Sequence, residues 1–159
     1  MGELRESAAL LGFYGDDLDP EELTAGLGSV PTVGVRKGGA WRTSLGGEKI
    51  ASTGSWRIKA ERCSPGDLDG QIRALLEPLT RDFDVWRDFS KRFGGRIFAG
   101  AFLGSGNDWL TLDADTIAAL AERGLYSIST SMPPRTLANE TPGAAMRYSR
   151  KGLIAPIGQ

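Results

Sequence analysis

The chain has 159 residues, enough for one domain that buries its own hydrophobic core without disulfides or metals. Its net charge of -1 gives no general attraction to nucleic acid or anionic lipid, and no apolar run approaches the roughly 20 residues of a membrane span. Histidine is absent and there is one cysteine, which excludes serine and cysteine triads, nearly all transition-metal sites and an internal disulfide. We therefore expect no metal and no cofactor, and the lack of a signal-peptide core predicts a cytoplasmic protein.

The first predicted unit is a buried strand over residues 8–14, an acidic loop and a short helix. Asp19 stands before a proline and is the predicted N-cap, with Glu22 as its capping-box partner. These rules of helix initiation account for Asp19 and Glu22. They leave Asp16 and Asp17 unexplained in the loop above the strand.

Residues 31–62 have the pattern of strands separated by glycine turns, at Gly38-Gly39 and at Gly46-Gly47. The segment "SWRIKAE" alternates between apolar and charged side chains, which indicates an antiparallel strand with one face toward water. Trp56, Ile58 and Ala60 form the apolar face of this strand, and Arg57, Lys59 and Glu61 the charged face.

The longest helical region follows, over residues 64–95, and Pro78 is expected to kink or end its first segment. Trp86 lies on the apolar stripe of the second segment and is predicted, like Trp56, to belong to the core. A buried strand "RIFAGAFLG", a further helix and the alternating strand "LYSISTSM" complete the pattern.

The last helix begins like the first. Asp113 is a second predicted N-cap, and Ile117, Leu120 and Ala121 are expected on the buried face of the helix that follows. The pairs "GFYG" with "AFLG" and "LDPEEL" with "LDADTI" suggest an internal duplication of a strand–loop–helix unit.

Together these elements predict an α+β fold in the order β-α-β-β-α-β-α-β, with the helices on one face of a mostly antiparallel sheet. Residues 1–132 form the predicted domain. Residues 133–159 lack periodicity and carry four basic residues against one glutamate, and we expect an extended or partly disordered arm there.

The stretches "GDDLDPEEL", "PT", "KG" and "TGSW", followed by a helix ending in "LLEPL", resemble the bacterial domain-of-unknown-function 4279 family. The resemblance covers Leu10 to Met132 and is most specific from Gly15 to Trp56. It implies a small cytoplasmic α+β protein of bacteria and no activity. By analogy, some members of such small families are partners of bacterial toxins.

Asp16 and Asp17 are the best candidate carboxylate pair, as a divalent-cation site or a general acid/base pair. The EF-hand spacing is missing, however, and a helix-entry loop with Asx-type turns explains the pair better. Similarly, the glycine pairs beside Arg42 are better explained as hairpin turns than as a phosphate loop.

Two tryptophans, Trp41 and Trp109, fall in predicted glycine-rich loops beside the charged residues Arg42 and Asp108. Exposed aromatic side chains next to charge are typical of binding hot spots, and equally they could cap the edge of the core. The candidate binding residues are therefore Asp16, Asp17, Trp41, Arg42, Asp108 and Trp109.

The leading hypothesis is a non-enzymatic binding protein, in particular an immunity-type inhibitor of a bacterial toxin or a module for another protein partner. Membranes and nucleic acid are not expected as partners. A small-ligand or nucleotide-binding regulatory domain is the second hypothesis, and a pocket containing Trp41 and Arg42 would favour it. A carboxylate- or metal-dependent hydrolase acting through Asp16 and Asp17 is the third.

Overall fold

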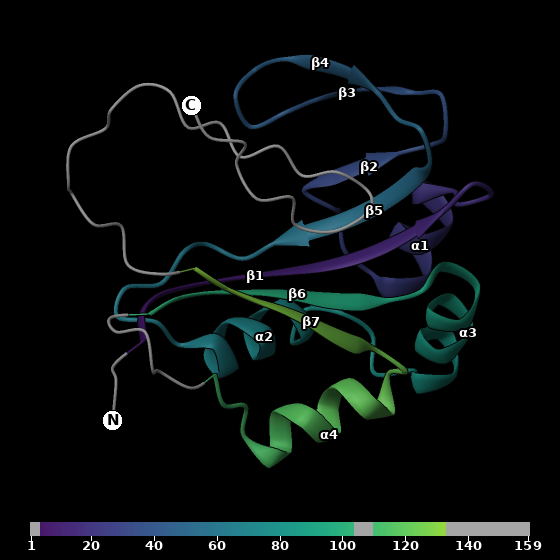
Figure 1. Ribbon diagram of the computed structural model, residues 1–159. Helices are drawn as coiled ribbons and strands as arrows, with labels where there is room; N and C mark the ends of the chain where they lie inside the picture. The colour runs from purple at the N-terminus through teal and green to yellow at the C-terminus, as the bar shows by residue number, and fades with distance from the viewer. Residues whose placement is uncertain (1–3, 104–109, 133–159) are drawn as a thin grey trace, which may run out of the picture.

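Figure 1 shows the computed structural model of the protein, which describes residues 4–103 and 110–132. The α+β class is confirmed, and the elements in chain order are β1 (Leu4–Gly15), α1 (Pro20–Leu27), β2 (Val33–Val35), β3 (Ala40–Arg42), β4 (Glu48–Ile50), β5 (Gly54–Lys59), α2 (Leu68–Leu76), α3 (Phe83–Phe93), β6 (Arg96–Leu103), α4 (Ala114–Glu122) and β7 (Tyr126–Met132). More strands precede α2 than predicted, because the glycine turns form a separate hairpin. The long helical region is divided into α2 and α3 around Pro78, as its proline indicates.

The main sheet has the strand order β2-β5-β1-β6-β7, and β3 pairs with β4 in a two-stranded sheet of its own. β1 lies at the centre and pairs antiparallel with β5 on one side and β6 on the other. Only the last pair, β6 with β7, is parallel, and α4 makes the crossover between the two strands. The sheet is therefore mostly antiparallel, as predicted.

The helices cover one face of this sheet. On β1 the side chains of Ala9, Leu11 and Phe13 point to them and are buried, as the period of two requires. Trp56 and Trp86 are fully buried, with ring centroids 5.9 and 6.1 Å from that of Phe13. The prediction that both tryptophans belong to the core is confirmed.

The two predicted N-caps differ. Asp19 caps α1, because its Oδ1 accepts a hydrogen bond of 3.0 Å from the backbone N–H of Glu21. Asp113 stands at the N-cap position of α4 with extended backbone, but its side chain makes no capping bond. That carboxylate instead accepts a hydrogen bond of 3.2 Å from Arg73 on α2. The prediction of a second capping interaction is wrong, because the side chain is bound to a neighbouring helix.

The buried face of α4 also differs from the prediction. Thr116 and Leu120, one helical turn apart, are buried, whereas Ile117 is 54% exposed and Ala121 is also exposed. The similarity between the two strand–loop–helix units thus extends to the order of their elements and not to helix capping or packing.

Replacing Asp19 by alanine should lower the free energy of unfolding by about 1 kcal/mol, because the backbone N–H of Glu21 loses its acceptor. Asp113→Ala should cost less than about 0.5 kcal/mol, since it removes only an exposed ion pair. Urea denaturation of both variants measures the difference. Asp19→Asn is the control: it retains a capping oxygen and loses the ion pair with Arg36, so it should behave like the wild type. Equal losses for Asp19→Ala and Asp113→Ala would contradict this assignment of the caps.

Two parts of the sequence-based predictions lie outside the described residues: residues 133–159, predicted to form a C-terminal arm, and the candidate binding residues Asp108 and Trp109. Within the described ranges, no helix has the length and apolar character needed to cross a membrane.

Candidate functional site

The face of the sheet opposite the helices is the candidate site, and we call it the open face. In the view of Figure 1, α2, α3 and α4 lie below the sheet and the β3–β4 hairpin lies above it. Alternation along each strand places basic and aromatic side chains on the upper side, in contrast to the apolar helix-covered side. On the described strands these are Tyr14 of β1, Arg57 and Lys59 of β5, Arg96 and Phe98 of β6, and Tyr126 of β7.

Strand register brings two arginines to either side of one glycine. Gly12 at the centre of the sheet is paired with Arg57 on β5 and with Arg96 on β6. Tyr126 of β7 is paired with Arg96 and continues the same row. Residues far apart in the sequence thus form one line across the open face.

The ring of Tyr14 fills the space above this glycine. A Cβ atom on Gly12 would lie 2.7 Å from the ring and the hydroxyl oxygen of Tyr14, so a side chain at position 12 would displace the ring. Burial raises the pKa of the Tyr14 hydroxyl above its ordinary value, although the charges of Arg57 and Arg96 act in the opposite direction. Tyr14 therefore lies within the field of both guanidinium groups.

Aromatic rings support both arginines. The Cζ atom of Arg96 lies 4.8 Å from the ring centre of Tyr14 and 5.2 Å from that of Tyr126. The Nε–H of Arg96 also donates to the carbonyl oxygen of Gly94 at 2.8 Å. Arg57 lies over Trp41, with its Cζ 4.6 Å from the ring centre. Such stacking fixes a guanidinium group and leaves its charge uncompensated.

Within residues 4–103 and 110–132, neither Arg57 nor Arg96 forms a salt bridge. Arg36, Arg73 and Arg92 in the same part of the chain each bind a carboxylate. The Nε of Arg57 is buried and has no hydrogen-bond partner among these residues. The open face thus carries positive charge that the described carboxylates do not neutralise.

The predicted acidic loop has a different electrostatic state. Asp16 forms a salt bridge with Lys37, and hydrogen bonds from Lys37 and Thr53 hold the pKa of its carboxyl below the ordinary value. Asp19 is bound to Arg36 at 2.8 Å. These contacts connect the loop after β1 to the segments around the hairpin, and they reduce its negative potential.

Among the residues described, no group of three or more Asp, Glu or Cys side chains could hold a metal ion. The structure therefore does not bring Asp16 and Asp17 together with a further carboxylate.

With the geometry established, comparison with known proteins identifies the family. A family model described as Domain of unknown function (DUF4279) matches residues 5–130. The chain belongs to the DUF4279 family. Comparison with curated proteins and with solved structures gives no match.

In this DUF4279 protein, Trp41 and Arg42 lie on strand β3 and not in a loop as predicted. The reason is that both glycine pairs form turns. Gly38, at φ 80°, lies in the turn before β3, and Gly46, at φ 83°, lies in the turn between β3 and β4, so these two strands pair as a hairpin. The hairpin interpretation of the glycines is confirmed. Trp41 belongs to the open face through its contact with Arg57, whereas Arg42 is exposed and stands opposite Glu48.

Tyr14, Arg96 and Tyr126 complete the cluster and are not among the binding residues predicted from the sequence. The alternation in "SWRIKAE" did place Arg57 and Lys59 on a wet face, and the exposed side chain of Lys59 agrees with it. The same alternation in "RIFAGAFLG" could have indicated that Arg96 and Phe98 share one face.

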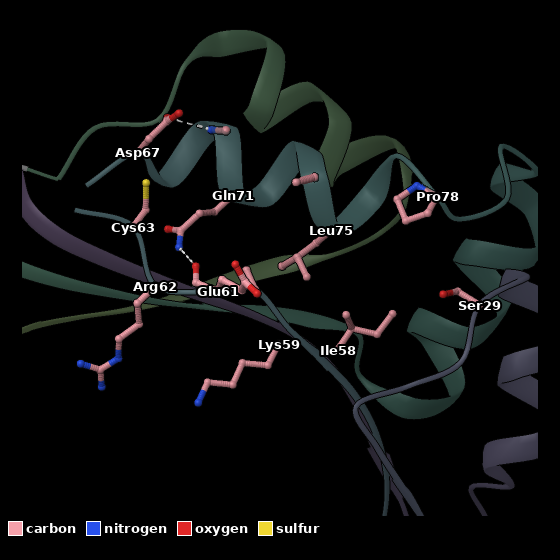
Figure 2. Close-up of a pocket in the computed structure, with 13 residues that line it drawn as sticks. Ser29, Ile58, Lys59, Glu61, Arg62, Cys63, Asp67, Gln71, Leu75 and Pro78 are labelled. Carbon is pink, nitrogen blue, oxygen red and sulfur yellow. Dashed lines mark hydrogen bonds between the residues drawn. The ribbon is translucent and has the colours of Figure 1, made fainter. Parts of the chain in front are cut away.

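Apart from the open face, the DUF4279 domain has a groove of about 600 Å³ between the end of β5 and α2. Its buried amide already has partners: the side-chain N–H groups of Gln71 donate to the carbonyl oxygens of Ser7 and Glu61. Figure 2 shows Lys59 and Arg62 pointing away from α2. The Gln71 hydrogen bonds thus attach the chain after β5 to the helix layer. The described contacts of the groove do not favour a catalytic or ligand-binding role.

Alkaline titration should detect the environment of Tyr14. Because burial raises its pKa, we expect this hydroxyl to ionise above 10.0, the ordinary value. Arg57→Gln and Arg96→Gln should each raise the pKa further, since each removes a positive charge that favours the phenolate. Absorbance at the phenolate band, with Tyr14→Phe as the difference control, measures the shift. A fall of the pKa in both arginine variants would contradict the cluster.

Proposed function

We propose that this DUF4279 protein is a non-enzymatic protein-binding module and that the open face is its contact surface. The observation that carries the proposal is the pair Arg57 and Arg96, each stacked on aromatic rings and neither neutralised by a described carboxylate. Arginine, tyrosine and tryptophan are the residues that dominate binding energy at protein interfaces. The open face combines arginine and tyrosine side chains of the main sheet with Trp41 of the β3–β4 hairpin.

The lining of the described grooves bears on the choice between a small ligand and a macromolecular partner. Small-molecule sites are concave and enclose most of their ligand. Two grooves formed by described residues, one beside α2 and one beside α1, include neither Trp41 nor Arg42. A pocket containing Trp41 and Arg42 would have favoured a small-ligand domain, and neither of these grooves is such a pocket.

The chemistry of the chain supports a non-enzymatic role. Without histidine, acid–base catalysis would depend on carboxylates, lysine, tyrosine or cysteine. Asp16 is held by Lys37 and Thr53, which keep its carboxyl ionised and its oxygens occupied. These contacts favour a structural role for Asp16 over that of a general acid.

An immunity-type inhibitor of a bacterial toxin is one form of such a module. Among the predicted binding residues, the acidic pair Asp16 and Asp17 would suit a basic toxin surface. The ion pairs in the acidic loop weaken that arrangement, so we propose that a toxin partner would meet the open face instead.

Site-specific photo-crosslinking tests the proposal. A benzoylphenylalanine at position 126 replaces a tyrosine that is 45% exposed on the open face, and one at position 117 replaces an isoleucine that is 54% exposed on α4. We expect one defined protein crosslink from position 126, absent at 117 and lost when Arg57→Gln is added. Crosslinking only from position 117, or at 126 without dependence on Arg57, would overturn the proposal.

A further inference from the structure

We infer that Arg57, Tyr14 and Arg96 form a carboxylate-binding site around Gly12, and that it receives an aspartate or glutamate side chain from an acidic partner protein. The inference rests on the proposed function and specifies the chemistry of the partner.

The spacing of the two arginines suits one carboxylate between them. Both are paired with Gly12 from the neighbouring strands, so their Cα atoms are about 10 Å apart, which is two strand spacings. Gly12 contributes no side chain to this gap, and the ring of Tyr14 lies across it with its hydroxyl group. We expect a carboxylate above the Tyr14 ring to be bound by guanidinium donors of the two arginines and by the phenol O–H.

The charge balance of the surface points in the same direction. Two guanidinium groups act on the same tyrosine, and their mutual repulsion is not offset by any described carboxylate. Glu6 on the same side of β1 is bound to Arg62 at 2.7 Å and is not available to them. Lys59, two residues after Arg57, adds a further positive charge to this face. An anion from a partner molecule would neutralise the positive charge of this face.

The number of these charges favours an acidic protein over a nucleic acid. Proteins that bind a phosphate backbone contact many phosphates, typically about 6–10, and depend on a broad basic surface. Here the cluster has two stacked arginines and one lysine in a chain of net charge -1, and the nearby β1–α1 loop is rich in acidic residues. An acidic side chain within a protein interface needs only the two guanidinium groups.

Fluorescence anisotropy with a labelled hexaglutamate peptide at low salt tests the site directly. We expect saturable binding by the wild type and about tenfold weaker binding for Arg57→Gln and for Arg96→Gln, because each loses charged hydrogen bonds. Arg81→Gln is the matched control, since Arg81 is exposed and lies between α2 and α3, and it should bind like the wild type. Circular dichroism of each variant verifies the fold.

Three results would overturn the inference: no binding of hexaglutamate by a folded wild type, equal loss in the Arg81→Gln control, or tighter binding of an oligothymidylate than of the peptide. Arg57→Lys separates geometry from charge, because lysine keeps the charge and loses the planar donor pair. This variant should bind hexaglutamate several-fold more weakly than the wild type. If crosslinking from position 126 persists while hexaglutamate fails to bind, the proposed protein-binding function stands and the carboxylate site is wrong.

Discussion

Trp56→Ala is expected to lower the free energy of unfolding by about 4 kcal/mol, the range found for removal of a large buried aromatic side chain. Trp56 is fully buried on the helix-covered side of β5, where its ring makes an edge contact with Phe13. Its Nε1–H donates to the Thr24 hydroxyl of α1 at 3.0 Å, so the substitution also removes the partner of a hydroxyl group in the helix layer.

Trp41→Ala is the matched comparison and should cost less than about 1 kcal/mol. Trp41 is half-buried on a two-stranded hairpin, and its stacking with Arg57 is a surface cation–π contact. Guanidinium denaturation of both variants gives the two free energies. A loss as large for Trp41→Ala as for Trp56→Ala would mean that the hairpin is part of the core, and it would remove Trp41 from the binding surface.

Local rules predicted much of the fold because the interactions involved are short in sequence. The Asp19 cap, the turns at Gly38 and Gly46 and the division near Pro78 each depend on a few neighbouring residues. The wrong assignment at Asp113 shows the limit of these rules. Asp113 does occupy the N-cap position, but its carboxylate binds Arg73, which is distant in sequence, and does not bind the backbone at the helix end.

The candidate site was harder to predict because it depends on strand register. Alternation alone indicates that Arg57 faces water, but it does not indicate which residue of another strand stands beside it. Gly12 is the shared neighbour of Arg57 and Arg96 only because β1 lies between β5 and β6. The same limit applies to Asp16, whose partner Lys37 is on a segment that pairing places nearby. In both cases the sequence identifies the charged residues, but it does not indicate which of them have an oppositely charged neighbour in the fold.

Charge reversal on the two candidate surfaces should separate them with the largest effect on binding. The partner is the protein captured by crosslinking, and surface plasmon resonance measures association and dissociation at low and high salt. Arg57→Glu combined with Arg96→Glu should weaken binding by about 100-fold or more, because a carboxylate of the partner would meet two like charges.

Asp16→Lys combined with Asp17→Lys should change the affinity by less than about threefold, since exposed charges at the edge of an interface act mainly on the association rate. The first variant should lose much of its salt dependence, whereas the second should retain it, because the attraction originates from the open face. Both variants alter exposed or half-buried side chains outside the hydrophobic core, and thermal melting verifies that each is folded. If the aspartate variant instead loses most of its association rate and the arginine variant binds like the wild type, the acidic loop is the interface and a basic toxin surface becomes the expected partner.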